Sequence, residues 1–221
     1  MLFFAPAQTV TGVQHTNCVN VPQRQLVELS SASGSDSNEK TFCEFEPLSE
    51  PLKWDQILHI ITSNRLHLLR RSKEQQAEYV KYFEEMKKHW AHPVDHVLHS
   101  KFDFGKRKVR NSTALQTEDV NELYEASPSL KEVTEVRTKL CKNEFPYYFE
   151  ENVEHWVLWK LKDGITNQEI QDAKDKLHTI SSEQGGGKKL VASAHWVNPP
   201  HLKSLPEIDH VHIVCLVSSD K

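Results

Sequence analysis

Two histidines separated by a single residue, His210 and His212, form the pattern with the clearest chemical potential in this chain. In a β-strand, residues i and i+2 project to the same side, so a strand over residues 210–217 puts both imidazoles on one face and Val211 on the other. Such a pair can attack and hold a phosphate, bind a metal ion, or only donate hydrogen bonds. The sequence therefore predicts a site on this strand and leaves its chemistry open.

The loop before this strand favours phosphate chemistry. It is rich in proline and carries amide, ammonium and hydroxyl groups, all of which can hold phosphate oxygens. His155 of an earlier strand is added to the set, although the residue pattern favours a strand histidine satisfied by a neighbour over a ligand. We predict His212 and His210 as catalytic residues and Asn198, Lys203, Ser204 and His155 as substrate-binding residues.

A metal site is the alternative use of the same segment. It would be a hydrolase site built from His195, His201, His210 and His212 with Glu207 or Asp209. Their spacing matches no zinc signature, and thirteen histidines along the chain make a chance cluster easy. No metal and no cofactor are therefore predicted.

The segment that leads to the histidine strand alternates strand and helix patterns. Residues 153–161 alternate between two sets that both contain large apolar side chains, Val157 and Trp159 in one and Trp156 and Leu158 in the other, which predicts a strand covered on both faces. Thr166 with Glu169 is a capping box that opens a helix whose apolar stripe is Ile170, Ala173, Leu177 and Ile180. Residues 190–197 predict another strand. The order is strand, helix, strand, long loop, histidine strand.

The N-terminal half is predicted to be mainly helical. Apolar residues at i, i+3, i+4 and i+7 predict a helix from Trp54 to Ile61, and the capping box of Ser72 and Gln75 predicts another. Residues 106–110 are predicted to be a basic loop, and part of 118–140 to be helix. The polar, low-complexity stretch 30–38 predicts a disordered tail over residues 1–47. The inward-facing residues expected on the second helix are Ala77, Val80, Phe83 and Met86.

We accordingly predict one α+β domain over residues 48–221, mainly helical over 48–145 and with the sheet over 146–217. Residues 51–221 hold equal numbers of acidic and basic side chains, so the body has no electrostatic footprint for nucleic acid or membrane. No stretch approaches the roughly 20 apolar residues that span a bilayer. The four cysteines are scattered without CxxC spacing, which favours a reducing compartment, the cytoplasm with nuclear access.

The sheet region resembles the histidine-triad fold and its nucleotidyltransferase relatives over residues 145–217. The stretch His210-Val211-His212-Ile213-Val214 is similar to their His-φ-His-φ-His motif, with His212 at the position of the nucleophile and Val214 where the third histidine belongs. The resemblance implies a mainly antiparallel sheet with helices, a bound nucleotide or nucleotide sugar, and a homodimer. Asn198 and Ser204 would then hold phosphate oxygens.

A second resemblance covers most of residues 50–217. The segments 64–72, 155–159 and 198–212 are similar to an uncharacterised fungal family whose named members are the N-acetylglucosamine-induced proteins of yeasts. It implies a cytosolic protein connected with amino-sugar metabolism. The predicted function is nucleotide or nucleotide-sugar binding at a degenerate triad-like site. The alternatives are an active nucleotidyl hydrolase or transferase with His212 as nucleophile, and a non-catalytic regulatory or protein-interaction module.

Overall fold

The computed structural model has an α+β fold and describes residues 46–110, 122–184 and 188–219. The predicted tail over 1–47 lies outside these residues except for its last two. No described helix is long and apolar enough to cross a bilayer. The elements are α1 (Trp54–Thr62), η1 (Leu66–Leu68), α2 (Lys73–His89), α3 (Pro93–Phe102), β1 (Gly105–Arg110), β2 (Glu122–Ser127), β3 (Arg137–Lys142), β4 (Val153–Leu161), α4 (Asn167–Gln184), β5 (Lys188–Trp196), η2 (Pro200–Leu202) and β6 (Asp209–Ser219).

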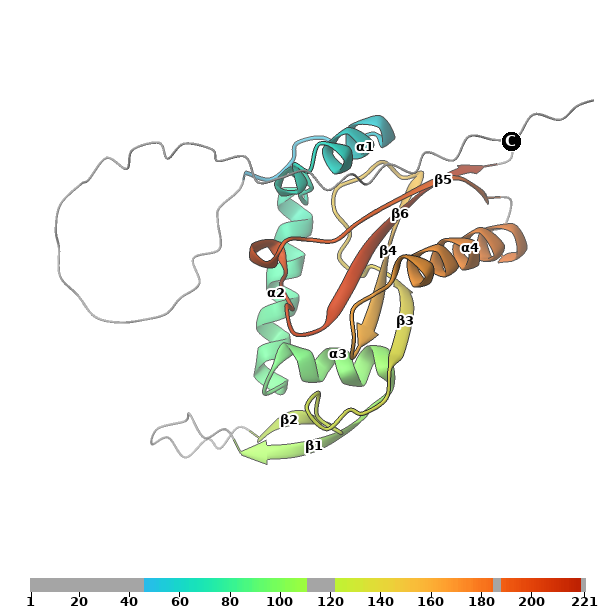
Figure 1. Cartoon of the computed structure of the whole chain (residues 1–221). Helices are drawn as coiled ribbons and strands as arrows, with labels where there is room; N and C mark the ends of the chain where they lie inside the picture. The colour runs from blue at the N-terminus through green and yellow to red at the C-terminus, as the bar shows by residue number, and fades with distance from the viewer. Residues whose placement is uncertain (1–45, 111–121, 185–187, 220–221) are drawn as a thin grey trace, which may run out of the picture. The chain divides into compact units, whose positions relative to one another are not determined.

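The main sheet has the strand order β3-β4-β6-β5, and every neighbouring pair is antiparallel. The helix α4 connects β4 to β5, and β6 then returns between them, so the order strand, helix, strand, loop, strand is confirmed (Figure 1). This arrangement is a split β-α-β unit. Because β6 is central, both of its faces are covered, and side chains on it are buried.

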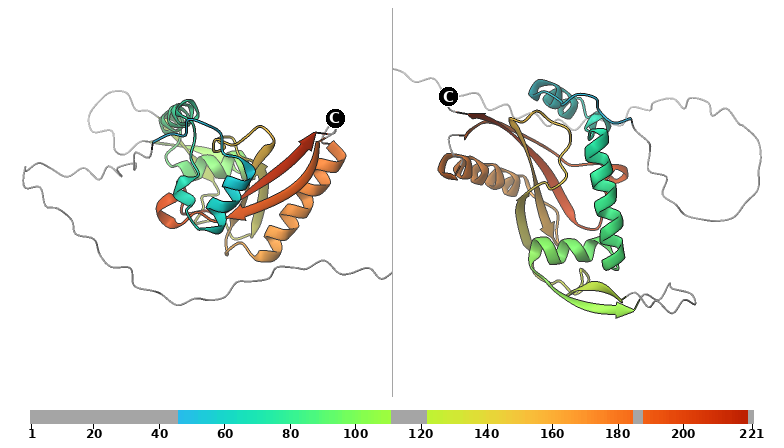
Figure 2. Two further views of the ribbon diagram at one scale, coloured as in Figure 1. Left: turned by 90° about the horizontal axis from the view of Figure 1, so that it is seen from above. Right: turned by 180° about the vertical axis from the view of Figure 1, so that it is seen from behind.

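The two faces of the sheet are covered by different helices, with α4 on one side and α1 to α3 on the other (Figure 2). On the α4 side, β6 contributes Val211, Ile213 and Cys215 to an apolar cluster that includes Ile170 and Leu177 of the predicted stripe. The capping box at the start of α4 is present, since the main-chain N–H of Glu169 donates to the Thr166 hydroxyl at 3.2 Å. The predicted split of β6 into two faces is therefore confirmed.

The opposite face of the sheet carries two apolar clusters with a polar stretch between them. At one end, α1 and η1 pack Ile57 and Leu66 onto Val214. At the other end, α3 packs Leu98 near Leu161, with the partly buried Trp159 against the same cluster. Along β6, Val214 lies at the first cluster, and His210 pairs with Trp159 at the second. His212 lies between them. The histidine pair thus lies between the two apolar clusters, and both histidines are buried.

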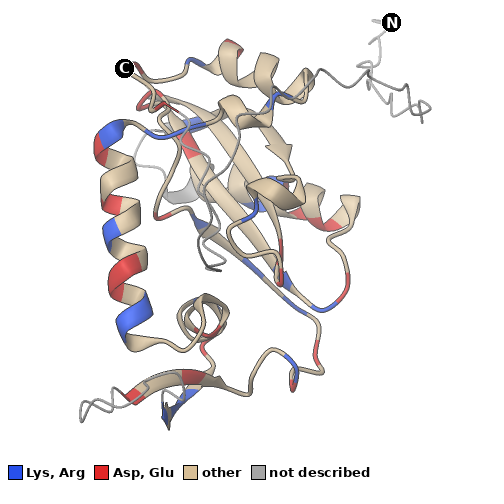
Figure 3. Ribbon diagram, turned by 90° about the vertical axis from the view of Figure 1, so that its left-hand side faces the viewer, with Lys and Arg blue, Asp and Glu red and all other residues tan. Residues whose placement is uncertain are grey.

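The inward face of α2 differs from the prediction. Ala77 is exposed and Val80 is 41% exposed, whereas Tyr79 and Tyr82 are partly buried. The tyrosine rings lie 5.5 and 4.6 Å from the ring of Phe145, so aromatic area displaces the smaller side chains from the contact. The outer face of α2 carries charges of both signs (Figure 3). The side that packs is Tyr79, Tyr82, Phe83 and Met86.

Two further predictions in the N-terminal half are wrong. Residues 106–110 belong to β1, which pairs antiparallel with β2, and no helix occurs between residues 122 and 140. The basic side chains of β1 are compatible with a strand because successive side chains point to opposite faces of a two-stranded ribbon, and both faces are largely exposed here. Arg107 pairs with Glu125 at 3.3 Å and Lys106 lies over the Tyr124 ring at 4.5 Å. Pairing with β2 determines that this segment is a strand. The run of basic residues gave no sign of that pairing in the sequence.

The start of α2 offers a test of local stability. The Ser72 hydroxyl accepts from the Gln75 N–H at 3.2 Å, and the Gln75 side chain accepts from the Ser72 N–H at 3.0 Å. Replacing Ser72 by Ala leaves the Gln75 N–H without its partner, so we expect a loss of about 1 kcal/mol in urea unfolding. Ser63→Ala, at the exposed C-terminal end of α1, is the control and should cost less. Equal costs would contradict the capping role.

Candidate functional site

The predicted site residues come from three elements that meet on one sheet face. His210 and His212 lie on β6, His155 lies on β4, and Asn198 follows β5. All four are buried; His212, the most accessible, is 8% exposed. Cross-strand pairing accounts for the convergence, because His212 faces Val157 on β4 and Trp196 on β5.

A chain of hydrogen bonds assigns the ring protons of His212. The Trp196 indole can only donate, and its Nε1 lies 3.0 Å from Oδ1 of Asn198. The Asn198 amide group therefore donates to Nε2 of His212 at 3.1 Å, and the proton of His212 sits on Nδ1. From there it is donated to Nε2 of His155 at 3.0 Å. Both ring nitrogens of His212 are thus engaged within the protein.

The far end of this chain is weaker. With Nε2 accepting, the proton of neutral His155 is on Nδ1, so the Asn143 amide at 3.4 Å and the Tyr147 N–H at 3.5 Å face Nδ1 without donating a hydrogen bond to it. The shorter contacts therefore set the tautomers. Stacking supports the same arrangement, since the His212 ring lies 5.0 Å from the Trp196 ring at an interplanar angle of 10°.

His210 presents a free lone pair. Its Nδ1 donates to the Ile208 carbonyl at 2.9 Å, which leaves Nε2 unprotonated in the neutral ring. No described residue bonds to Nε2, and no described side-chain nitrogen or oxygen that is fully buried lacks a partner. Nε2 is therefore the atom through which His210, itself 4% exposed, reaches the surface. The geometry favours His210 over His212 as the residue that meets a ligand.

The loop residues predicted to bind substrate lie near His210. Lys203 has a largely buried side chain, and its Nζ lies 3.4 Å from Oδ1 of Asp209. Ser204 is exposed and interacts with Tyr79 of α2. The positive charge of Lys203 lowers the pKa of both His210 and His212. Lys203 and Ser204 therefore border the site without belonging to the buried hydrogen-bond chain.

The three histidines are neutral at pH 7. Burial, and after it the charge of Arg71, lowers the pKa of His155 to about 3. The pKa of His212 lies well below its ordinary value, chiefly through burial and then through the other two histidines, Arg71 and Lys203. Burial also lowers the pKa of His210. Neutral imidazoles can accept a proton or a hydrogen bond, which suits a binding site for polar groups.

Two further residues of the site were not predicted. Arg71 and Tyr147 come from segments far from β6 in sequence. The Arg71 guanidinium lies 4.1 Å from the Tyr79 ring and 5.3 Å from the Tyr147 ring. Tyr147 stacks on His155 at 5.4 Å, and its hydroxyl lies 3.4 Å from the Asn198 amide. Their signal in the sequence was indirect, since Arg71 lies inside one of the segments that carry the family resemblance.

The alternative metal set does not converge. His195 pairs with Ile213 across β5 and β6, so it faces the α4 side, away from His212. His201 is exposed on η2, and Glu207 lies 4.0 Å from His92. Across residues 46–110, 122–184 and 188–219, no three His, Cys, Asp or Glu side chains are grouped to hold a metal ion. This part of the chain gives the metal alternative no support.

Comparison with known proteins confirms the fungal resemblance. The chain is 26% identical over 183 residues to N-acetylglucosamine-induced protein 1 of Candida albicans, covering 78% of this chain and 71% of that protein. It is 27% identical over 170 residues to the uncharacterized protein YPL067C of Saccharomyces cerevisiae, covering 73% and 77%. A solved structure described as the crystal structure of HTC1 is 21% identical, covering 74% of this chain and 84% of that one, with a TM-score of 0.42.

A TM-score of 0.42 does not establish a shared fold, and nothing is inferred from that structure. The family assignment depends on a different comparison, whose match covers α1 through most of β6 and so includes every residue of the site described above. Residues 53–216 match the model of the family described as "Protein of unknown function (DUF3605)", and the chain belongs to that family.

Proposed function

We propose that this protein serves fungal amino-sugar metabolism in the cytosol by binding a nucleotide or nucleotide sugar on the polar face of β6. The metabolic part is supported by the name of the Candida albicans relative, which is induced by N-acetylglucosamine. The binding part is supported by the polar residues on β6 and by the order strand, helix, strand, loop, strand, which the resemblance to the histidine-triad fold implies. Nuclear access and a homodimer, which follow from composition and from the triad analogy, complete the proposal.

The single observation that carries the ligand proposal is the unpartnered Nε2 of His210 at the edge of a buried polar cluster. A cluster of neutral imidazoles and an amide is costly to bury and contributes less to stability than apolar packing. Lys203 stands beside it with a positive charge that only Asp209 offsets. A phosphate group bound here would contact the ammonium group of Lys203 and the imidazole of His210.

Binding without turnover fits this geometry better than catalysis by His212. The lone pair of His212 accepts from Asn198, so nucleophilic attack would first require that bond to break. Val214, at the position of the third triad histidine, is fully buried against Ile57 of α1. That position is therefore part of an apolar core and offers no contact to a phosphate. Nucleotidyl transfer through His212 remains the alternative.

Calorimetric titration of the full chain tests this proposal. We expect binding of UDP-N-acetylglucosamine or of UDP, and a loss of about tenfold in affinity for His210→Phe, because that variant keeps a ring against Trp159 and removes Nε2. His195→Phe, on the opposite face of the same sheet, is the matched control and should bind as the parent does.

Absence of heat with UDP-N-acetylglucosamine, UDP and AMP would overturn the nucleotide proposal. So would equal affinity of His210→Phe and the parent protein, since the ligand would then lie elsewhere. If His210→Phe does not fold, Lys203→Met removes the neighbouring charge from a partly accessible position and should also weaken binding. Release of a nucleoside monophosphate from the titrated ligand would favour the catalytic alternative.

A further inference from the structure

Arg71 is a largely buried cation that has no acidic partner within the described part of the chain. It immediately precedes the capping residue of α2, and burial is the main cause that lowers its pKa. Its Nε and Nη2 both donate to the Phe145 carbonyl, at 3.3 and 3.0 Å. A guanidinium has five N–H bonds, so three remain without a hydrogen-bond partner among the described residues. Buried charges are normally paired, and this one is not.

The surroundings of Arg71 hold the guanidinium plane without neutralising it. The Tyr79 and Tyr147 rings lie 4.1 and 5.3 Å from its central carbon, which gives cation–π contacts. Aromatic faces and a carbonyl fix the orientation of the fork and leave its charge in place. A fork that is oriented in advance loses little side-chain entropy when it binds an oxyanion.

The same two tyrosines connect Arg71 to the site. Tyr147 reaches the Asn198 amide, and Asn198 bonds His212. Tyr79 interacts with Ser204, which follows Lys203 in the loop before β6. The charge of Arg71 also acts on His155 and His212, whose pKa values it lowers. Arg71 therefore borders the polar face of β6 through these two tyrosines.

We propose that Arg71 binds a phosphate group of the ligand, as a two-pronged donor, with the Ser204 hydroxyl beside it. This inference deepens the proposed function and depends on the same site. Lys203 is already paired with Asp209, whereas no acidic side chain of the described residues is paired with Arg71. A tetrahedral oxyanion matches both the charge and the fork geometry of a guanidinium. The phosphate belongs either to a nucleotide or to a sugar phosphate.

Inorganic phosphate is the first probe, used with the full chain. Thermal unfolding is followed while sodium phosphate replaces sodium chloride at constant ionic strength. We expect phosphate to raise the unfolding temperature of the parent protein and not that of Arg71→Gln, because a ligand of the folded state stabilises it. Arg70→Gln is the matched control, since Arg70 also donates to two main-chain carbonyls, those of His67 and Glu46.

Phosphate-bearing ligands are the second probe. We expect Arg71→Gln to weaken UDP or N-acetylglucosamine 6-phosphate, whichever binds the parent, by about tenfold to a hundredfold. Inorganic phosphate should compete with that ligand. Comparing UDP with the sugar phosphate identifies the source of the phosphate group. If Arg71→Gln does not fold, Arg71→Lys keeps the charge, removes the fork, and should weaken binding by about tenfold.

Two outcomes separate this inference from the proposed function. If inorganic phosphate stabilises the protein through Arg71 but no nucleotide or nucleotide sugar binds, the nucleotide ligand is wrong and the phosphate site stands. If UDP binds the parent, Arg71→Gln and Arg71→Lys equally well, Arg71 only ties the 143–149 segment to α2. The inference is then wrong, and the nucleotide proposal stands.

Discussion

Acidification from pH 7 to pH 5 is expected to lower the free energy of unfolding by about 2 kcal/mol through His155 alone. The pKa of His155 is about 3 in the folded protein and near 6.5 when the chain is unfolded. Below about pH 6.5 the histidine is protonated in the unfolded state but stays neutral in the folded state, so the free energy of unfolding falls as the pH drops. The loss continues until the pH reaches the folded pKa. His212 adds to it in the same direction.

The physical cause is a buried ring with cations around it and no carboxylate in contact. His155 is 2% exposed and packed against the rings of Tyr147, Phe149 and Trp196. Arg71 is the charge that acts on it, and it opposes protonation. Burial and charge thus act in the same direction, and nothing at the site favours imidazolium.

Urea unfolding at a series of pH values measures this effect. His155→Phe should reduce the slope of stability against pH between pH 7 and 5 by nearly one proton, whatever it does to stability at pH 7. His178→Asn, on the exposed side of α4, is the matched control variant. An unchanged slope for His155→Phe would show that His155 is not the group responsible.

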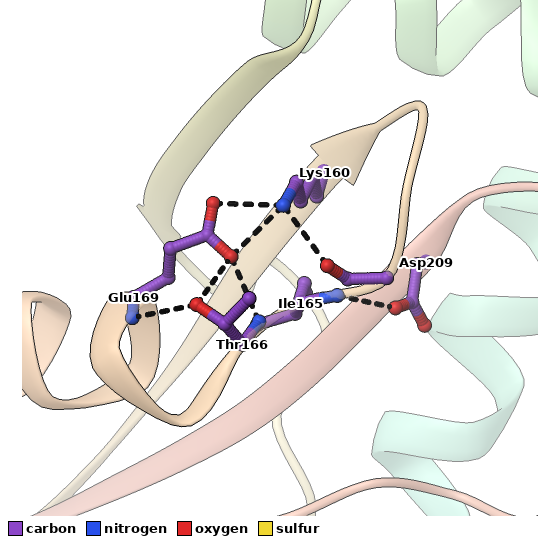
Figure 4. Close-up of polar contacts among 6 residues, drawn as sticks. Lys160, Ile165, Thr166, Glu169 and Asp209 are labelled. Atoms are coloured by element: carbon purple, nitrogen blue, oxygen red, sulfur yellow. Dashed lines mark hydrogen bonds and ion pairs between the residues drawn. The ribbon is translucent and has the colours of Figure 1, made fainter.

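Glu169→Ala is expected to destabilise the protein by about 3 kcal/mol, because it removes the acidic partner of a buried lysine. Lys160 is 5% exposed on β4, and its Nζ lies 2.9 Å from a Glu169 carboxylate oxygen and 2.9 Å from the Gly164 carbonyl. The same carboxylate accepts from the N–H and hydroxyl of Thr166 (Figure 4). The capping box of α4 and the ion pair are therefore one structure.

Lys160→Met should cost less, about 1 kcal/mol, because an apolar chain of similar length fills the space and leaves no buried charge. Glu169 then keeps its contacts with Thr166 and is partly solvated. Glu85→Ala, which breaks the exposed pair with Lys88, is the control and should leave the unfolding midpoint unchanged. A Lys160→Met variant as unstable as Glu169→Ala would mean that the lysine itself, and not its charge balance, stabilises this turn.

Local patterns were sufficient to predict much of the sheet region. The alternation of residues over 153–161 predicted β4, and the capping boxes at Ser72 and Thr166 predicted where α2 and α4 begin. These signals are short-range: a cap needs residues only three apart, and strand alternation follows from the pleat. Sequence patterns gave wrong predictions where contacts with distant segments determine which residues are buried or paired. In α2, tyrosines displaced Val80 from the core, and the basic residues 106–110 paired with β2.

For the site, the sequence by itself determined that His210 and His212 share a face of a central strand, because a side-chain period of two requires it. Which ring keeps a free lone pair was decided only by the tertiary structure. Asn198 occupies Nε2 of His212, and the Ile208 carbonyl turns Nε2 of His210 outward. The approach of Arg71 was likewise invisible beforehand, since packing between distant segments brings it to the face of β6. Hydrogen-bond direction and charge balance depend on partners distant in sequence, and spacing carries no information about them.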